Sequence, residues 1–356
     1  MTGMTSMTNG GGVTGPGFTI VIGSFLEEEQ VRRIAAAPAA GRVIYEPGLL
    51  PVPRFRCDHT GRPRDLSPAD LARWRALAAE AEVYFDFDWL DPAQMPGRSP
   101  KLRWIQATSA GIGGFMKRTG LDDASLEVTT AAGIHAVPLA EFALTGALYL
   151  VKGLPELRRW QQAQHWEGYT TRQLAGLRAL VVGLGGIGRQ VAASFAGLGV
   201  DVWGLGREGA AYDVAGLSRV IDRTGLDEAL PQTDIIVLAC PLTDQTQGLI
   251  GARQLGLLPP GAILINVARG PVVDQAALTR ALRDGQLGGA CLDVFAQEPL
   301  PPGDPLWELD NVIVSPHSAS TVATENATLT SLFLDNLARL AAGEPLRNRY
   351  DPQRGY

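Results

Sequence analysis

A glycine-rich segment in the middle of the chain constrains its fold more than any other feature. The apolar run at residues 178–182 leads directly into Gly183-Leu184-Gly185-Gly186-Ile187-Gly188, and an amphipathic stretch follows. A strand, a turn with this glycine spacing and a helix make up the first unit of a doubly wound parallel sheet. Later apolar runs predict the other strands of that sheet, at residues 201–205, 235–239, 262–267, 289–293 and 312–315.

The same glycines predict a nucleotide site. Gly183 permits the tight turn, Gly185 lets the backbone approach a pyrophosphate, and Gly188 lets the helix pack close to the strand. Free backbone amides and the positive end of the helix dipole would then hold the two phosphates. The alternative interpretation is a glycine-rich turn that binds no ligand.

The end of the next strand bears on the choice of nucleotide. A chain that binds NAD usually has Asp or Glu there, about 20 residues after the motif, to bond the ribose 2′-hydroxyl. This chain has Gly206 and Arg207 instead. A missing carboxylate removes repulsion of a 2′-phosphate, and a guanidinium can bind that phosphate with forked geometry. We therefore predict NADP(H) as the preferred cofactor, with NAD(H) possible. Glu208 is an unfavourable neighbour, and the alternative is that Arg207 is an ordinary surface residue.

The residues before this sheet predict a second α/β domain, because strands alternate with helices there as well. Apolar runs predict its strands at residues 18–22, 42–45, 82–87, 102–108 and 126–130. One helix is expected at 26–36, and Ser67 with Pro68 is a good N-cap and first-turn pair for a helix that runs to about Glu80. The expected fold is a Rossmann-type doubly wound parallel sheet inserted into a flavodoxin-like α/β domain.

Two further helices indicate how the domains connect. Pro138 opens a long apolar helix from Leu139 to about Lys152, which leads toward the glycine motif. A last helix, at about 323–342, is ended by Gly343 and has no strand of its own, so it is expected to pack on the first domain. The predicted organisation is a mobile tail at 1–17, a substrate domain at 18–137 and 320–356, and a dinucleotide-binding domain at 138–319.

Three of the later strands each end close to a side chain with catalytic chemistry. Arg269, Glu298 and His317 follow the strands at 262–267, 289–293 and 312–315. Ligands of open parallel sheets lie beyond the carboxyl ends of the strands, so these three side chains are expected at one crevice. Taken singly, the alternatives are a helix-terminal arginine, a solvated loop carboxylate and a satisfied core histidine.

The three side chains match the needs of hydride transfer to a 2-oxo acid. Arg269 can hold the substrate carboxylate and polarise the carbonyl through a bidentate contact. His317 can give a proton to the alkoxide that hydride addition leaves, and can accept one in the reverse direction. Glu298 can pair with the other ring nitrogen and so fix the tautomer of His317.

In these motifs the chain resembles the D-isomer-specific 2-hydroxyacid dehydrogenase family. The motifs span nearly everything from Leu102 to the C-terminus: Gly183–Gly188, Asn266–Pro271, Gly289–Pro299 and Ser315–His317, with lesser matches at Ala140-Glu141 and Cys240–Thr243. The first strands look most like those of the glyoxylate/hydroxypyruvate reductase branch. Because members of the family are usually dimeric, the resemblance implies a homodimer.

The resemblance also implies roles for individual residues. Arg269 would bind the substrate, Glu298 would support the histidine, and His317 would be the acid/base. The implied cofactor contacts are Gly183, Gly185, Gly186, Ile187, Gly188, Gly206, Arg207, Cys240, Pro241, Val267, Ala268 and Asp293, with Gly186 and Ile187 at the diphosphate and Asp293 at the nicotinamide carboxamide.

For the substrate, the resemblance points to the backbone amides of Ser109-Ala110-Gly111 at the domain cleft and to Trp89 in a nearby loop. Ser320 lies in the segment Ser318-Ala319-Ser320 after His317. This segment departs from the family pattern, and its serines would alter the polarity of the substrate pocket. Trp166 matches a position that in some members reaches the partner's active site. Core packing is the alternative for both tryptophans.

Composition excludes several other classes. A net charge of −6 argues against a nucleic-acid partner, since phosphate binding needs clustered Lys and Arg. The longest apolar stretch, Ala143–Val151, is far short of the roughly 20 residues that cross a bilayer, so no membrane partner is expected. Three widely spaced cysteines predict reduced thiols in a cytoplasmic protein. The four histidines are scattered, so no metal site is expected.

Two rival interpretations remain open at this point. One is a dehydrogenase of the same fold with another substrate, such as phosphoglycerate or formate. Many phosphoglycerate enzymes have an extra C-terminal domain, whereas this chain ends soon after its last helix, and formate enzymes have Gln in place of Glu298. The other is a nucleotide-sensing scaffold without catalysis, against which the intact set of catalytic residues argues. The favoured partner is thus a small 2-oxo or 2-hydroxy acid.

Overall fold

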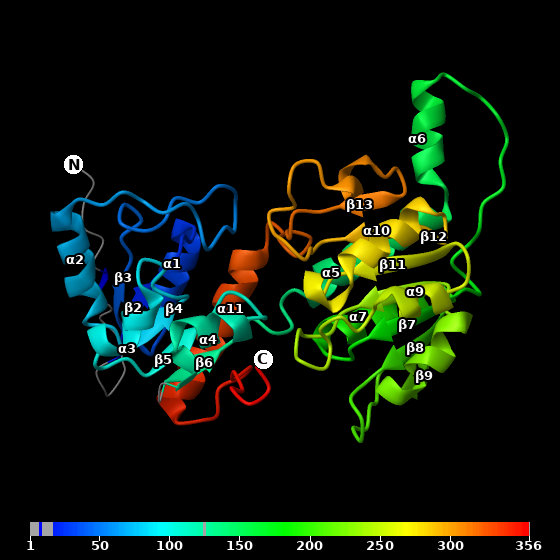
Figure 1. Cartoon of the computed structure of the whole chain (residues 1–356). Coiled ribbons are helices and arrows are strands. Elements are labelled where there is room, and N and C mark those ends of the chain that lie inside the picture. Colours follow the sequence, from blue (N-terminus) through cyan, green and yellow to red (C-terminus); the bar gives the residue numbers. More distant parts are fainter. Residues whose placement is uncertain (1–6, 9–16, 124–125, 356) are drawn as a thin grey trace. The chain divides into compact units, whose positions relative to one another are not determined.

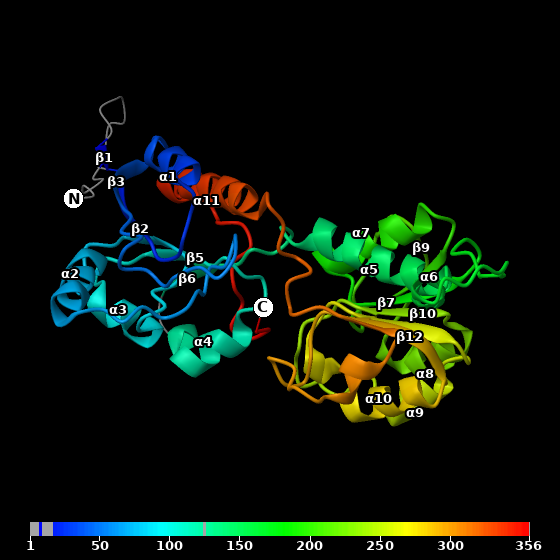
Figure 2. The ribbon, with the colours of Figure 1, turned by 90° about the horizontal axis from the view of Figure 1, so that it is seen from above.

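The computed structural model describes residues 7–8, 17–123 and 126–355, and these form two compact units (Figure 1). Unit 1 comprises the described residues of Met1–Ile134 together with Thr321–Tyr356, and unit 2 is His135–Ser320. Each unit has a largely parallel sheet with helices on both faces (Figure 2). The α/β class predicted from the sequence is therefore confirmed.

Among the described residues, the sheet of unit 1 has six strands in the order β1-β3-β2-β4-β5-β6. They are β1 (Met7–Thr8), β2 (Phe18–Ile22), β3 (Ala40–Ile44), β4 (Val83–Phe85), β5 (Trp104–Gln106) and β6 (Glu127–Thr129). All neighbours pair in parallel except β1 with β3. Without β1 this is the flavodoxin-like order, in which the topological switch point lies between β2 and β4.

Helices cover both faces of this sheet (Figure 2). One face carries α1 (Glu28–Ala35) and α11 (Glu325–Ala342), and the other carries α2 (Pro68–Ala78), α3 (Met95–Arg98) and α4 (Gly113–Thr119). Phe333 of α11 is fully buried and stacks on Trp104 of β5, with ring centroids 5.0 Å apart. The last helix thus packs on the first sheet. Ser67 caps α2 as predicted, because its side chain accepts a hydrogen bond from the Asp70 amide.

The sheet of unit 2 has seven parallel strands in the order β13-β12-β11-β10-β7-β8-β9. They are β7 (Arg178–Val182), β8 (Asp201–Leu205), β9 (Leu217–Ile221), β10 (Ile235–Leu238), β11 (Ala262–Asn266), β12 (Leu287–Leu292) and β13 (Val312–Val314). This is the Rossmann order with one strand added beyond β12. Apolar strand residues are buried on both faces, which is what a parallel sheet between two helix layers requires.

The helices of unit 2 lie on the two faces of its sheet (Figure 2). One layer holds α5 (Ala136–Val151) and α7 (Gly186–Ala196), the other holds α8 (Leu226–Ala229), α9 (Ala252–Leu257) and α10 (Gln275–Arg283), and α6 (Leu154–Gln162) projects away. Short 3₁₀ turns complete the two units, at Pro92–Gln94, Leu121–Asp123, Arg223–Gly225, Leu230–Gln232, Gly270–Val272 and Pro305–Glu308.

Three elements differ from the sequence predictions. β9 was not predicted, because Ser218, Arg219 and Val220 of this edge strand are exposed and leave no apolar run. α6 was not predicted either, since none of its residues is buried. Met7–Thr8 of the expected tail pair with the edge strand β3, whose outer backbone groups are available. The rest of the tail before Gly17 lies outside the described residues.

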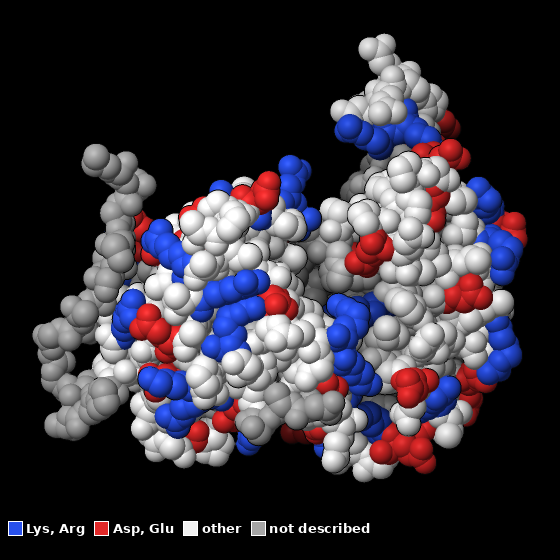
Figure 3. Space-filling view, turned by 60° about the vertical axis from the view of Figure 1, so that its left-hand side comes forward, with Lys and Arg blue, Asp and Glu red and all other residues white. Residues whose placement is uncertain are grey.

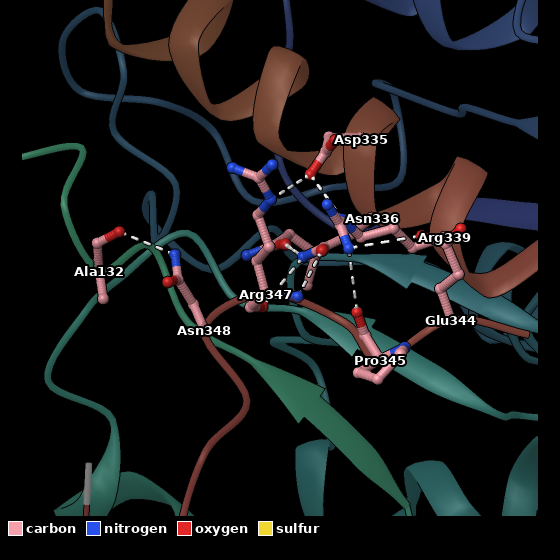
Figure 4. Close-up of polar contacts among 9 residues, drawn as sticks. Ala132, Asp335, Asn336, Arg339, Glu344, Pro345, Arg347 and Asn348 are labelled. Atoms are coloured by element: carbon pink, nitrogen blue, oxygen red, sulfur yellow. Dashed lines mark hydrogen bonds and ion pairs between the residues drawn. The ribbon is translucent and has the colours of Figure 1, made fainter.

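A buried asparagine fixes the chain after α11 (Figure 4). Asn336 is fully buried, and its Oδ1 accepts a hydrogen bond of 2.8 Å from the Arg347 amide. Its Nδ2 donates to the Arg347 carbonyl at 3.2 Å and to Gln106 Oε1, at the end of β5, at 3.1 Å. One side chain therefore joins α11, the sheet and the C-terminal segment, which Asn348 also ties to the Ala132 carbonyl.

We expect Asn336→Ala to lower the free energy of unfolding by roughly 2–4 kcal/mol, because it leaves the Arg347 amide without its partner and removes one of the two hydrogen bonds to Gln106 Oε1. Asp335→Asn is the matched control. Asp335 is the preceding residue, and it pairs only with the partly exposed Arg339 and Arg347, so the loss should stay below about 1 kcal/mol. Urea unfolding of both variants measures the difference. Equal losses would contradict the role given to Asn336.

Candidate active site

The parallel direction of the strands brings the predicted catalytic and cofactor residues of unit 2 to one edge of its sheet. Gly183, Cys240, Arg269, Asp293 and His317 each follow the carboxyl end of a strand. Those strands, β7 and β10 to β13, are consecutive neighbours in the sheet. Such an edge, at the switch point beside β7, is where open α/β sheets bind ligands.

The glycine turn has the conformation that close backbone approach requires. Gly183 has φ +98°, and a Cβ there would lie 2.7 Å from the Cys240 backbone. A Cβ on Gly188 would lie 1.8 Å from the Gly183 carbonyl oxygen, so helix and strand contact each other directly. A Cβ on Gly185, by contrast, would meet nothing within 4 Å. The turn is therefore tight beneath α7 and open at Gly185, where a phosphate could approach the first amides of the helix.

Two arginines and a tyrosine lie together at the end of β8. Tyr212 Oη accepts a hydrogen bond of 2.9 Å from the Arg207 amide, and Arg189 Nη1 donates to the Asp213 carbonyl at 2.7 Å. Burial would raise the pKa of Tyr212, but the Arg207 bond and the charges of Arg207 and Arg189 lower it below its ordinary value. The tyrosine ring covers Gly206, where a Cβ would lie only 2.3 Å from it.

Sequence reasoning missed Arg189 and Tyr212. The position of Arg189 directly after the glycine motif is a usable signal, because the first turn of the helix faces the nucleotide. No comparable signal identifies Tyr212, which the fold of a loop brings back to Gly206.

Glu298 and His317 form the polar pair at the end of the sheet. Glu298 Oε2 lies 2.7 Å from His317 Nδ1, and its Oε1 accepts a hydrogen bond of 2.9 Å from the Phe295 amide. Burial raises the pKa of Glu298, but the bond and charge of His317, with the Phe295 amide and Arg269, lower it below its ordinary value. An ionised carboxylate only accepts, so Nδ1 carries the hydrogen and Nε2 is left to act on a ligand.

Asp293 holds the loop that presents His317. Its Oδ1 accepts hydrogen bonds from Ser315 Oγ at 2.6 Å, from the Ser318 amide at 2.9 Å and from the Ala319 amide at 3.0 Å. His317 itself has φ +52°, a conformation that costs a residue other than glycine on the order of 1 kcal/mol or more. The three bonds on either side of it keep the residue in that conformation. Burial raises the pKa of Asp293, although these bonds and His317 oppose that shift.

Arg269 is held at the same edge. Its Nη1 donates to the Ala268 carbonyl at 2.7 Å. Burial lowers the pKa of its guanidinium, while the charges of Glu298 and Asp293 oppose that effect. A partly desolvated guanidinium is suited to holding a carboxylate, because charge-assisted bonds are strong where water is excluded.

The remaining cofactor candidates of unit 2 lie at the same edge. Val267 and Ala268, after β11, and Cys240, after β10, are buried, whereas Pro241 is exposed. Burial raises the pKa of the Cys240 thiol to about 11, so the thiol is neutral at ordinary pH. These residues therefore offer apolar walls and backbone groups rather than charge.

The predicted substrate residues Ser109-Ala110-Gly111 and Trp89 lie in unit 1, while Ser320 is the last residue of unit 2. Ser109-Ala110-Gly111 follow β5, with Ser109 and Gly111 exposed. Trp89 follows β4 and donates from Nε1 to Asp86 Oδ2 at 2.8 Å. Its ring packs against Phe87 and Phe115, so the core-packing alternative describes part of its role.

Trp166 is 99% exposed, which rules out core packing within this chain. Among the described residues, no single helix is long and apolar enough to cross a membrane, and only α5 and α6 together, bent by 62°, reach that length and composition. The described part of the chain also holds no group of three metal-ligating side chains. Lys and Arg are interspersed with Asp and Glu on the face shown in Figure 3.

Comparison with known proteins supports these observations. Residues 144–319 match the family model described as the NAD binding domain of D-isomer specific 2-hydroxyacid dehydrogenases. A glyoxylate reductase of Thermofilum pendens is 33% identical over 315 residues, which are 85% of this chain and 91% of that protein. Glyoxylate/hydroxypyruvate reductase B of Yersinia enterocolitica is 31% identical, over 72% of this chain and 79% of that protein.

The chain is also similar to solved structures of 2-hydroxyacid dehydrogenases over nearly its whole length. A D-isomer specific 2-hydroxyacid dehydrogenase of Xanthobacter autotrophicus, in complex with NADPH and MES, is 32% identical with a TM-score of 0.76 and covers 96% of this chain and 100% of its own. A probable 2-hydroxyacid dehydrogenase of Rhizobium etli, in complex with NADP, HEPES and L(+)-tartaric acid, is 27% identical with a TM-score of 0.72, over 95% and 99% of the two chains.

Proposed function

Because this chain belongs to the D-isomer specific 2-hydroxyacid dehydrogenase family, we propose that it reduces a small 2-oxo acid of the glyoxylate or hydroxypyruvate type to the D-2-hydroxy acid, with NADPH as the reductant. The observation that carries the proposal is the pairing of Glu298 with His317 at 2.7 Å, at the sheet edge where Arg269 is held. The names of the relatives and the NADP-bound structures support the substrate class and the cofactor.

In the proposed reaction each of the three residues has one task. Arg269 binds the substrate carboxylate and draws electron density toward the carbonyl oxygen. When bound, the cofactor supplies a hydride to the carbonyl carbon, and the electron pair of the C=O π bond moves to oxygen. His317 Nε2 gives its proton to that oxygen, and Glu298 stabilises the imidazolium before this transfer and fixes the ring orientation.

The residues around the glycine turn fit a dinucleotide with a 2′-phosphate. Open space at Gly185 and the amides of Gly186 and Ile187 would take the diphosphate, with Gly183 and Gly188 shaping the turn. Arg207 and Arg189 would bind the 2′-phosphate at the end of β8, where this chain has Gly206 in place of the usual carboxylate. NADP(H) is thus the preferred cofactor, with NAD(H) possible, and Cys240, Pro241, Val267, Ala268 and Asp293 would line the rest of its site.

For the substrate, the backbone amides of Ser109, Ala110 and Gly111 are proposed to hold the carboxylate, and Trp89 and Ser320 are proposed as further substrate contacts. We also propose a homodimer. α6 projects from unit 2 with no buried residue of its own, and the loop after it carries the fully exposed Trp166 (Figure 1). A cytoplasmic location would keep the three buried, unpaired cysteines reduced.

A substrate panel tests the proposal. Glyoxylate, hydroxypyruvate and phenylpyruvate are each assayed by loss of NADPH absorbance, and His317→Asn should lower turnover at least about a hundredfold, the scale of a lost general acid. Cofactor affinity should stay unchanged in the variant. If NADPH binds tightly but no oxo acid is reduced, a nucleotide-sensing scaffold is the better description.

We expect Glu298→Gln to move the pH profile of reduction toward acid. The amide keeps a hydrogen-bond acceptor for Nδ1 but removes the negative charge, so the protonated imidazole is stabilised less. Reduction needs the protonated form, so activity should fall off earlier as the pH rises. Turnover is measured from about pH 5 to pH 9 for both proteins. An unchanged profile would mean that the pair has no electrostatic role.

Arg207→Ala should raise the KM for NADPH by about tenfold or more, because charge-assisted bonds to a phosphate are lost, and should leave the KM for NADH nearly unchanged. Arg280→Ala, on the exposed surface of α10, serves as the matched arginine control. Gly206→Asp is a poorer test because its Cβ would collide with Tyr212. A wild type that already prefers NADH would overturn the assignment of Arg207.

A further inference from the structure

A second polar cluster lies in unit 1, and none of its members has been assigned a role so far. His59 comes from the loop before α2, Asp86 follows β4, and Glu325 and Asn326 open α11. Asp86 is 0% exposed, Glu325 5% and Asn326 1%, and the His59 side chain is 9% exposed. Buried ionisable groups are costly unless they act on one another.

The hydrogen bonds of the cluster determine the tautomer of His59. Asn326 Nδ2 donates to Glu27 Oε2 at 2.8 Å, so its Oδ1 is the atom that faces His59 Nε2, at 2.7 Å. An amide oxygen only accepts, and therefore Nε2 carries a hydrogen. Nδ1 is the other ring nitrogen, and Glu325 Oε1 lies 4.0 Å from it.

Asp86 is the carboxyl group that links this cluster to Trp89. It has φ +68°, and its Oδ2 accepts the indole hydrogen of Trp89 at 2.8 Å. Burial raises the pKa of Asp86, while the positive charge of His59 is the strongest opposing effect. Among the described residues, Asp86 Oδ1 and Glu325 Oε2 are buried without a hydrogen-bond partner.

The bond to Asp86 is the directional contact of the Trp89 ring. Its other ring contacts are with Phe87, at 6.0 Å between centroids, and Phe115, at 5.3 Å. Such apolar contacts constrain the plane of a ring less than a hydrogen bond to a buried carboxylate does. The charge of Asp86 therefore decides how firmly the indole is held.

We propose that Asp86, with His59 as its charge partner, is a positioning residue that fixes the Trp89 indole for binding of the oxo acid. The inference rests on the proposed function, in which Trp89 is a substrate contact. An ionised Asp86 holds the indole hydrogen by a charge-assisted bond, and protonation weakens that bond. Binding of the oxo acid should therefore weaken as the pH falls through the titration of Asp86.

Other charged groups border the cluster and do not reverse this expectation. Burial raises the pKa of Glu325 and of Cys57, so both favour their neutral forms. Glu27 is paired with Arg56 at 3.0 Å, and the pKa of Glu27 is lowered by its bonds to Asn326 and Arg56, against the effect of burial. Of the neighbouring charges, that of His59 most opposes the effect of burial on the pKa of Asp86.

Intrinsic fluorescence tests the link without any need for turnover. The full-length protein is titrated from about pH 5 to pH 9, and the wild type should show a transition that is absent in Trp89→Phe and in Asp86→Asn. His59→Gln keeps a donor for Asn326 but removes the cation, so the transition should move to higher pH. Trp74→Phe is the matched control, since Trp74 also donates to a buried aspartate, Asp88 at 3.1 Å, and this variant should keep the transition.

Kinetics test the consequence for the oxo acid. Asp86→Asn should raise the KM for the oxo acid at pH 8 roughly fivefold and leave kcat and NADPH affinity nearly unchanged. In the wild type and in Trp74→Phe the KM should rise as the pH falls. In Asp86→Asn this rise should be absent. The inference is overturned if Asp86→Asn keeps the wild-type fluorescence transition or the wild-type KM profile. A wild type that shows the transition but reduces no oxo acid would refute the proposed function and leave the Asp86–Trp89 link intact.

Discussion

The carboxylate of Asp293 is the interaction on which the geometry of the candidate site depends. One buried oxygen accepts hydrogen bonds from Ser315, Ser318 and Ala319, and so ties the end of β12 to the loop after β13. Between those donors His317 takes a left-handed conformation that it would otherwise avoid. The cost of that conformation is offset by three bonds to one buried carboxylate. The imidazole is thereby held in one orientation, as the acid/base role proposed for it requires.

Glu298 completes this arrangement from a different direction. The Phe295 amide donates a hydrogen bond to Glu298 Oε1 and so fixes the carboxylate. The second oxygen, Oε2, is thereby held next to His317 Nδ1. Its lowered pKa means that it remains an anion in the pH range where an imidazole titrates. Arg269 contributes the opposite charge at the same edge, and its charge also helps to keep Glu298 ionised. The ionisation of Glu298 therefore depends on the charges of both His317 and Arg269.

The sequence was informative wherever a local pattern determines structure. Gly183 and Gly188 are needed by the turn itself, and Arg269, Asp293 and His317 follow strands whose apolar runs are plain. β9 and α6 escaped prediction because their exposed residues give no such run. Tyr212 over Gly206 and Asn326 beside His59 escaped for another reason. Their contacts join residues brought together only by the fold, across 267 positions in the case of His59, and no periodicity encodes them.

The two sheets use a buried aspartate in the same way. Asp86 follows β4 and Asp293 lies directly after β12, both carboxyl groups are buried, and burial raises the pKa of each. Asp86 accepts a hydrogen bond from Trp89 in the loop that follows it, and Asp293 accepts hydrogen bonds from the loop after the neighbouring strand β13. The positive charge of a histidine opposes the rise in pKa of each aspartate. A carboxylate at the end of a parallel strand can reach backbone and side-chain donors of adjacent loops, because those loops leave the sheet at the same edge. Burial then makes its bonds strong and its ionisation sensitive to neighbouring charge. The same physical arrangement can therefore orient His317 in one unit and the Trp89 indole in the other.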